Sequence, residues 1–308
     1  MMRVAVVDIG TNSTRLLVCD VDGERVTDEL ERRSTVTRLG AGVDAGGRLD
    51  GDAMNRVFAT LDDYRELIGR HGAERLIAVL TSAVREAANG REFTTEVEQR
   101  YGLRAHILSG DEEARLTFLG ATGERDPQDP TPTAVIDIGG GSTEIVIGSG
   151  HKASFHLSTR AGVVRQTERH LHADPPSEAE LERTREDVRS VLREGVPEDR
   201  RRAVEHAIAV AGTATSLAAI DQRLEPYDPT KVHGYRLSRE RCAQILDHLA
   251  QLPLRERREV AGLHPDRAPT IIAGILILIE VLALFDLDAV EISEHDILRG
   301  AAVGLQSD

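Results

Sequence analysis

The sequence predicts an α/β protein made of two similar lobes. Apolar runs of strand length alternate with helix-length amphipathic segments along all 308 residues. A hairpin pattern near the N-terminus recurs in the middle of the chain, and the polar, proline-rich stretch GERDPQDPTP at 123–132 separates the two copies. We therefore expect a first lobe at 1–124 and a second lobe at 125–295.

The second copy of the hairpin, TAVIDIGGGSTEIVI at 133–147, is typical of a strand, a tight turn and a second strand. Consecutive glycines remove every Cβ from the turn, so backbone N–H groups can close around an anion. Asp137 and Glu144 flank the turn and would repel a bare phosphate, a conflict that a divalent cation such as Mg²⁺ removes. The turn therefore predicts a phosphate and a metal ion. Its candidate phosphate-binding residues are Gly139, Gly140, Gly141 and Ser142.

The first copy, VAVVDIGTNSTRLLV at 4–18, shares Asp-Ile-Gly and then Ser-Thr with the second. A single glycine-rich hairpin is more often an ordinary turn, but two copies favour a functional repeat. Asp8 is a weaker candidate for the same metal ion. The candidate phosphate-binding residues of this copy are Gly10, Thr11, Asn12 and Ser13.

These paired hairpins resemble the phosphate loops of the actin, hexokinase and Hsp70 superfamily, which has duplicated ribonuclease H-like domains with a cleft between them. More narrowly, DIGTNSTRLLV with DIGGGSTEIVI resembles the exopolyphosphatase and guanosine pentaphosphate phosphatase (Ppx/GppA) family. The resemblance extends over essentially the whole chain. It implies a short form without the C-terminal helical domains of longer members, in which long-chain processivity is in doubt, and a terminal helix at 296–308 that returns to the first lobe.

Composition excludes several classes of protein. A formal net charge of −14 argues against coating nucleic acid or binding anionic membranes. Cys19 and Cys242 match no metal or redox spacing, which favours a reducing cytoplasm, and we expect no signal peptide. The apolar run 271–285 is shorter than a membrane span of about 20 residues and contains Glu280, so we expect a buried helix.

In the first lobe, the segment at 52–70 has apolar residues at helical spacing. A glycine-rich stretch at 40–51 precedes it. The other elements that we expect here are strands at 25–39, 76–80 and 105–108 and a helix at 93–101.

Arg85 follows the strand at 76–80, where open α/β sheets commonly hold ligands. A guanidinium there can clamp phosphate with two parallel hydrogen bonds, and the alternative is a surface ion pair with Glu86 or Glu92. The residues leave both open. The resemblance of TSAVREA to the family's arginine segment favours phosphate binding.

Ser109 and Glu112 have the spacing of a capping box, which gives Glu112 a structural role. Glu113 is then available to accept a proton from an attacking water, and the alternative is a first-turn acid that complements the helix dipole. The run SGDEEAR resembles the family segment that carries the catalytic base. The resemblance places that base at Glu113.

In the second lobe, Gly212 and Thr213 follow a buried strand and begin a helix. This arrangement is typical of an anion site at a helix N-terminus and resembles the superfamily's third phosphate loop, although an ordinary threonine N-cap is the alternative. We expect His233 to be structural or exposed. The remaining elements that we expect are strands at 151–157, 207–211 and 288–292 and helices at 161–170, 177–193, 238–251 and 271–285, with a closing helix from 297.

The resemblance implies hydrolysis of the terminal phosphoanhydride of inorganic polyphosphate. Glu113 would activate the water, Arg85 would neutralise developing charge, and Asp137 with Glu144 would hold Mg²⁺ or Mn²⁺. The nearest alternative is hydrolysis of guanosine pentaphosphate. A kinase of the acetate or sugar type, which usually has an Asp base, and a non-catalytic sensor of polyphosphate or alarmones are further alternatives. For the assembly of this chain, a homodimer is the state that we consider.

Overall fold

The computed structural model describes residues 2–23 and 25–305, and the chain divides into two compact units. The first unit contains 1–125 and 296–308, and the second contains 126–295. The chain passes from the first unit to the second within the polar, proline-rich stretch. It returns to the first unit at Asp296, the N-cap residue of the last helix.

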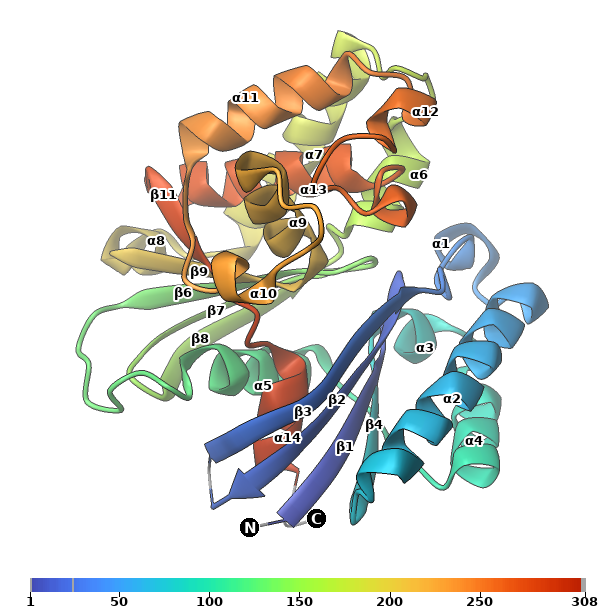
Figure 1. The fold of residues 1–308 in the computed structure, drawn as a ribbon. Coiled ribbons are helices and arrows are strands. Elements are labelled where there is room, and N and C mark those ends of the chain that lie inside the picture. Colours follow the sequence, from blue (N-terminus) through green and yellow to red (C-terminus); the bar gives the residue numbers. More distant parts are fainter. Residues whose placement is uncertain (1, 24, 306–308) are drawn as a thin grey trace. The chain divides into compact units, whose positions relative to one another are not determined.

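The first unit has a five-stranded mixed sheet with the order β3-β2-β1-β4-β5 (Figure 1). β1 pairs antiparallel with β2 and parallel with β4, and β4 pairs parallel with β5. The parallel strands end at the same edge, and the segments that follow them carry most of the predicted site residues of this unit. The strands are β1 Met2–Ile9, β2 Ser13–Asp22, β3 Arg25–Val36, β4 Arg75–Leu80 and β5 Arg104–Ile107.

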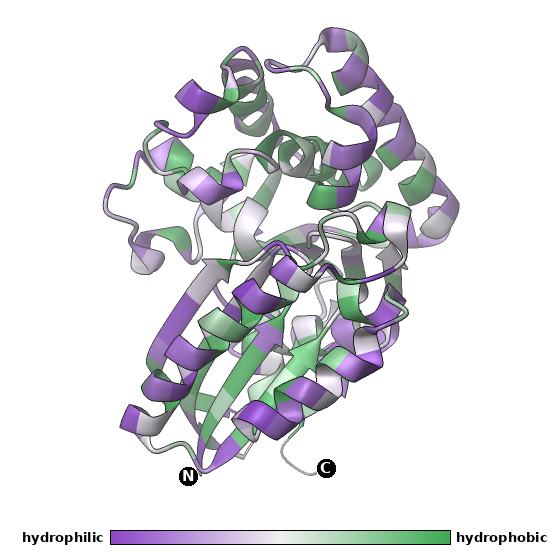
Figure 2. Cartoon of the chain, turned by 90° about the vertical axis from the view of Figure 1, so that its right-hand side faces the viewer, coloured by the Kyte–Doolittle hydropathy of each residue, from purple (hydrophilic) through white to green (hydrophobic). Residues whose placement is uncertain are grey.

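Alternation along β1 divides the core of this unit between the two faces of the sheet. Ala5 and Val7 pack into one apolar cluster with α2 and α4, whereas Val4 and Val6 pack into another with α14 and Leu116 of α5. Figure 2 shows hydrophobic strands behind helices that mix hydrophobic and hydrophilic residues. The helices are α1 Val43–Gly46, α2 Gly51–His71, α3 Ser82–Glu86, α4 Gly90–Tyr101, α5 Gly110–Thr122 and α14 Ile297–Gly304.

Two glycines allow α5 and α14 to pack with their backbones in contact (Figure 1). A Cβ on Gly120 would lie 1.9 Å from the carbonyl oxygen of Asp296, and a Cβ on Gly300 would lie 1.8 Å from that of Leu116. Both distances are far below a van der Waals contact. Any side chain at either position would therefore push the helices apart.

The second unit has a six-stranded sheet with the order β10-β11-β9-β6-β7-β8. β6 pairs antiparallel with β7 and parallel with β9, and β9 pairs parallel with β11. The order β8-β7-β6-β9-β11 thus repeats the order β3-β2-β1-β4-β5 of the first unit. The strands are β6 Thr133–Ile138, β7 Thr143–Ser149, β8 Lys152–Thr159, β9 His206–Val210, β10 Arg236–Ser238 and β11 Ala289–Ile292.

The apolar helix α13 is the centre of the helical layer in this unit. It spans 14 residues, and Glu280 within it is 6% exposed and receives two hydrogen bonds from Arg189 of α7. Among the described residues, no helix is long and apolar enough to cross a membrane. The helices are α6 Val163–His170, α7 Glu178–Gly195, α8 Glu198–Ala203, α9 Ala211–Gln222, α10 Pro229–Val232, α11 Arg239–Ala250, α12 Leu254–Arg257 and α13 Ile271–Leu284, with a short 3-10 turn at Pro265–Arg267.

The repeated strand order makes the chain a duplicated, two-lobed α/β protein of the actin-like, ribonuclease H-like class. The predicted long helices and hairpin strands are confirmed, with ends that differ by a few residues. The short elements α1, α3, α8, α10, α12 and β10 were not predicted, because segments of three to six residues are too short to show a hydrophobic period.

Candidate phosphatase site

The two predicted glycine-rich hairpins form and are built alike. In the first, Gly10 N–H donates to the carbonyl of Ser13 at 3.0 Å; in the second, Gly139 N–H donates to that of Ser142 at 2.9 Å. These two amides close the turns and are not available to a substrate. The candidate amide donors of the first loop are therefore those of Thr11, Asn12 and Ser13, and those of the second are Gly140, Gly141 and Ser142.

The carbonyls of both turns accept hydrogen bonds from neighbouring segments. In the first loop, Asn12 O accepts from the amides of Thr37 and Arg38 at 3.0 and 2.9 Å; in the second, Gly140 O accepts from Val164 N–H at 2.8 Å. Because a trans peptide holds its C=O and N–H on opposite sides, the next amide in each loop points away from these neighbours. The amides of Ser13 and Gly141 are therefore turned away from these neighbouring segments, which makes them candidate donors to an anion.

The pair of opposite residues next to each turn gives the two loops different charges. Asp8 lies opposite Arg15 in the β1–β2 register, and Asp137 lies opposite Glu144 in the β6–β7 register. Directly opposite residues of an antiparallel pair lie on the same face. The first loop therefore places a carboxylate beside a guanidinium, and the second places two carboxylates side by side.

Asp8 is buried in an ion pair. Its Oδ2 accepts from Arg15 Nη2 at 2.6 Å and from Nε at 2.8 Å, and Arg15 also binds Asp296. Burial raises the pKa of the Asp8 carboxyl above its ordinary value, and the charge of Arg15 opposes this rise. Among the described residues Oδ1 of Asp8 has no hydrogen-bond partner, which leaves one buried carboxylate oxygen for a water molecule or a hydrated cation.

Asp137 and Glu144 fit a hard divalent cation better than Asp8 does. They are 7% and 1% exposed, and Glu144 Oε1 also accepts from Ser158 Oγ at 2.8 Å. Two adjacent carboxylates are the usual protein ligands of Mg²⁺, whereas the carboxylate of Asp8 is already paired with a guanidinium. The donor set of the second loop therefore suits Mg²⁺ or Mn²⁺.

Arg85 and Glu113, predicted from separate segments, form an ion pair in the first unit. Arg85 Nη1 donates to Glu113 Oε2 at 2.9 Å and to the carbonyl oxygen of Leu108 at 2.8 Å. The alternative ion pair with Glu86 or Glu92 is therefore not the contact that the structure shows for this guanidinium. Among the described residues, Nε and Nη2 of Arg85 make no hydrogen bond. These groups remain able to bind a phosphate oxygen.

The start of α5 holds Glu113 in place. Ser109 and Glu112 form the predicted capping box, with Ser109 Oγ accepting from Glu112 N–H at 3.2 Å and Glu112 Oε2 accepting from Ser109 N–H at 2.9 Å. Glu113 follows and is 6% exposed. A carboxylate this buried, beside a cation and at a helix N-terminus, is suited to proton transfer rather than to a solvated helix surface.

The segment carrying Arg85 also contacts the first loop and has close backbone packing of its own. Thr11 Oγ1 and Ser82 Oγ share a hydrogen bond of 2.8 Å, so the start of α3 is joined to the first hairpin. A Cβ on Gly90 would lie 2.0 Å from the carbonyl oxygen of Val84, so only glycine allows α4 to begin this close to α3. The predicted loop and the arginine segment are thereby brought together within the first unit.

The predicted third phosphate loop contains a strained residue and an unpredicted arginine. Ala211 has φ of 64°, a left-handed conformation that a residue with a Cβ rarely adopts, and such strain is concentrated at functional turns. A Cβ on Gly212 would lie 1.5 Å from Nη1 of Arg267, so this guanidinium lies against the start of α9. The threonine N-cap alternative is wrong, because the N-cap of α9 is Val210 and Thr213 lies inside the helix. Arg267 has no sequence signal, since it comes from an irregular, polar segment far along the chain.

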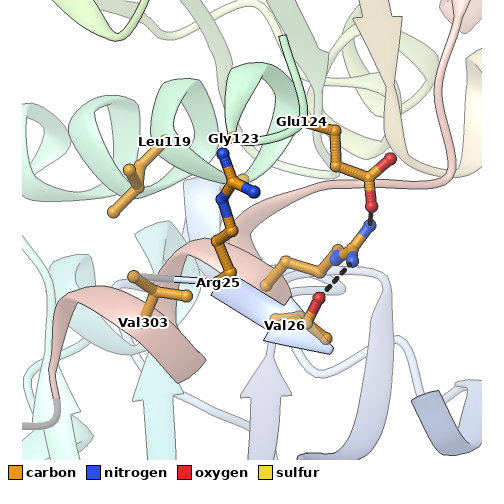
Figure 3. A pocket seen from close by; sticks show the side chains of 8 residues that line it. Arg25, Val26, Leu119, Gly123, Glu124 and Val303 are labelled. Carbon is orange, nitrogen blue, oxygen red and sulfur yellow. Dashed lines mark hydrogen bonds and ion pairs between the residues drawn. The ribbon is translucent and has the colours of Figure 1, made fainter. Parts of the chain in front are cut away.

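A cavity of about 250 Å³ lies elsewhere in the first unit (Figure 3). Its walls include Leu119 and Gly123 of α5 and Val303 of α14, and the side chain of Arg25 points toward Gly123. Glu124 at its edge pairs with Arg299 at 2.8 Å. None of the predicted site residues lines this cavity, so it is separate from the candidate phosphatase site.

The two cysteines take no part in the candidate site. Cys19 and Cys242 are free and buried. Burial raises the pKa of each thiol to about 12. At neutral pH both are protonated, which excludes a thiolate nucleophile at these positions.

Several known proteins are similar to this chain. The model of the Ppx/GppA phosphatase family matches residues 17–305. Exopolyphosphatase 2 of Mycobacterium tuberculosis is 38% identical over 318 aligned positions that cover 99% of each chain. A crystal structure of the Aquifex aeolicus member of the Ppx/GppA family is 32% identical, with a TM-score of 0.81 and coverage of 99% and 97% of the two chains. A crystal structure of an exopolyphosphatase from Cytophaga hutchinsonii is 27% identical, with a TM-score of 0.87 and the same coverage. The chain therefore belongs to the Ppx/GppA phosphatase family.

Proposed function

We propose that this chain is an exopolyphosphatase, which hydrolyses the terminal phosphoanhydride of inorganic polyphosphate and releases orthophosphate. The observation that carries the proposal is the ion pair between buried Glu113 and partly buried Arg85. It combines a proton acceptor with a guanidinium that has hydrogen-bond donors to spare. The relatives named exopolyphosphatase support the choice of substrate.

In the proposed reaction Glu113 accepts a proton from the attacking water, and the new O–P bond forms as the terminal anhydride bond breaks. Arg85 orients Glu113 through Nη1, and its remaining N–H groups stabilise charge on the transferred phosphoryl group. The backbone amides of Asn12, Ser13, Gly140 and Gly141 bind phosphate oxygens. Sugar kinases, which transfer phosphate to an acceptor, usually have an aspartate base. The glutamate at position 113 therefore favours transfer to water.

Asp137 and Glu144 would hold Mg²⁺ or Mn²⁺, a bound cation that offsets phosphate charge. Both residues come from the second hairpin, and Ser158 orients Glu144 from the neighbouring strand β8. Asp8 is the weaker candidate, because Arg15 already neutralises its carboxylate. We therefore propose that the second loop, rather than Asp8, holds the metal ion.

The test is orthophosphate release by wild type and Glu113→Gln with Mg²⁺, using short polyphosphate, long polyphosphate, guanosine pentaphosphate and ATP in parallel. We expect release from polyphosphate that falls by about 10²-fold or more in the variant, with substrate binding retained. Preference for the pentaphosphate would show that guanosine pentaphosphate, rather than polyphosphate, is the substrate. Equal activity in the variant would remove Glu113 from the mechanism, and release from none of the four would refute the hydrolase.

A further inference from the structure

His233 and His295 form an imidazole pair in the second unit, outside the residues assigned to phosphate chemistry. Their ring centroids lie 4.1 Å apart with an interplanar angle of 34°, and ligand nitrogens of the two rings lie within 4.8 Å of each other. His233 follows α10, and His295 follows β11. The pair thus joins segments that are distant in sequence.

Backbone hydrogen bonds hold these two segments in register. Gly234 N–H donates to Ile292 O at 2.8 Å, and Ile292 N–H donates to Tyr235 O at 2.8 Å. These bonds fix the backbone just after His233 and three residues before His295. The approach of the rings is therefore set by the fold of the second unit rather than by side-chain rotation alone.

The spacing of the ring nitrogens suits a shared metal ion. Zn–N bonds are about 2.0–2.1 Å long, so two nitrogens on one tetrahedral ion lie roughly 3.4 Å apart. Because the ligand nitrogens lie within 4.8 Å of each other, an approach of about 1.4 Å or less brings them to that distance. His233 is exposed, so an ion can enter and water can complete its coordination. Imidazole pairs suit Zn²⁺, Ni²⁺ and Cu²⁺, whereas Mg²⁺ requires oxygen ligands.

Ser293 supplies the supporting contact that a metal-binding histidine needs. Its Oγ lies 3.4 Å from His233 Nδ1 and donates to the carbonyl oxygen of His295 at 3.2 Å. With its proton directed to that carbonyl, the hydroxyl can accept from Nδ1–H of His233. This tautomer leaves the lone pair of His233 Nε2 for a metal ion, as in known sites where the second ring nitrogen is held by a hydrogen bond.

A competing arrangement is also present without a metal ion. Glu294 N–H lies 3.3 Å from the same Nδ1 of His233 and can donate to it. That tautomer places the proton on Nε2 and prevents metal binding there. Metal binding therefore requires the other tautomer of His233, in which Nδ1–H donates a hydrogen bond to Ser293 Oγ.

We propose that His233 and His295 bind a divalent transition-metal ion such as Zn²⁺, with Ser293 as the residue that orients His233. The ligands are imidazole nitrogens, so this site differs in metal preference from the carboxylates of Asp137 and Glu144. A bound ion ties the segment after α10 to the segment after β11. It therefore stabilises the second unit whether or not the proposed hydrolase activity is correct.

The test is calorimetric titration of the full-length protein with Zn²⁺ in a buffer that contains excess Mg²⁺ to occupy carboxylate sites. The variants are His233→Gln, His295→Gln and Ser293→Ala. The matched control is His248→Gln, which removes an exposed histidine of α11 in the same unit. A parallel thermal unfolding series with and without Zn²⁺ reports the stabilisation directly.

We expect the wild type and the His248 variant to bind Zn²⁺ equally. Loss of either ligand histidine should weaken the affinity by about tenfold or more, and Ser293→Ala should weaken it by about 10–100-fold. Zn²⁺ should raise the unfolding temperature of the wild type more than that of His233→Gln. Unchanged affinity in both ligand variants, or no binding by the wild type, would show that the rings only stack. Loss of affinity in one ligand variant alone would also refute a shared ion.

Discussion

A double-mutant cycle on Arg85 and Glu113 tests whether the arginine acts on the substrate or only through the glutamate. The Arg85 side chain has nitrogens suited to each of these two roles. Nη1 holds Glu113 and the carbonyl of Leu108, while Nε and Nη2 have no hydrogen-bond partner among the described residues. The perturbations are Glu113→Gln, Arg85→Gln and the two together.

The magnitudes follow from these two roles. Loss of a general base lowers turnover by about 10²–10⁴-fold, and loss of one donor to developing charge lowers it by about 10²–10³-fold. If Arg85 only positions Glu113, removing it from the Glu113→Gln variant costs nothing further. Because part of the guanidinium is uncommitted, we expect the double variant to turn over at least about tenfold more slowly than Glu113→Gln.

The assay is single-turnover release of orthophosphate from short polyphosphate at saturating enzyme, so that binding does not limit the rate. Thermal unfolding of each variant controls for loss of structure, since Arg85→Gln leaves a buried carboxylate without its cation. A double variant as fast as Glu113→Gln would refute direct action of Arg85 on the phosphoryl group. It would leave Arg85 as a positioning residue.

Three further predictions concern stability. Hydrogen bonds from backbone amides lower the pKa of Glu180 from 4.5 to about 2. The contribution of Glu180 to the free energy of unfolding is therefore full above about pH 5 and is lost toward pH 2. In urea unfolding, the difference in free energy of unfolding between wild type and Glu180→Gln should shrink over that range. Gly300→Ala places a Cβ 1.8 Å from Leu116 O and should lower the free energy of unfolding by about 1–3 kcal/mol. The unfolding temperature should then fall by about 2–4 °C per kcal/mol. An unchanged temperature would contradict the packing of α5 on α14. Arg189→Met strands the buried carboxylate of Glu280; because the Arg189 side chain is 41% exposed, we expect a cost of about 3 kcal/mol or less in thermal unfolding, and the double variant with Glu280→Leu should recover most of it.

The sequence alone determined the duplicated hairpins, the capping box at Ser109 and the family. These features are local, because glycine-rich turns, alternating strands and helix caps are encoded within a few neighbouring residues. The buried helix at 271–285 was predictable in the same way, from a run of apolar residues too short for a membrane span. Short helices escaped prediction because they contain less than two turns of periodic sequence.

Only the tertiary structure decided which side chains meet. Arg85 and Glu113 belong to α3 and α5, and their ion pair depends on the order of β4 and β5 in the sheet. The contact of Arg267 with Gly212 depends likewise on the path of the chain in the second unit, far beyond the range of local patterns.

The pair of His233 and His295 shows the same limit most clearly. Each histidine lies in an irregular segment, and one of them was expected to be structural or exposed. The ladder between residues 234–235 and 292 brings the rings together, and that ladder is a non-local pairing whose register no single segment specifies. The sequence therefore determined the kinds of local structure and chemistry present, whereas tertiary packing decided which groups act together.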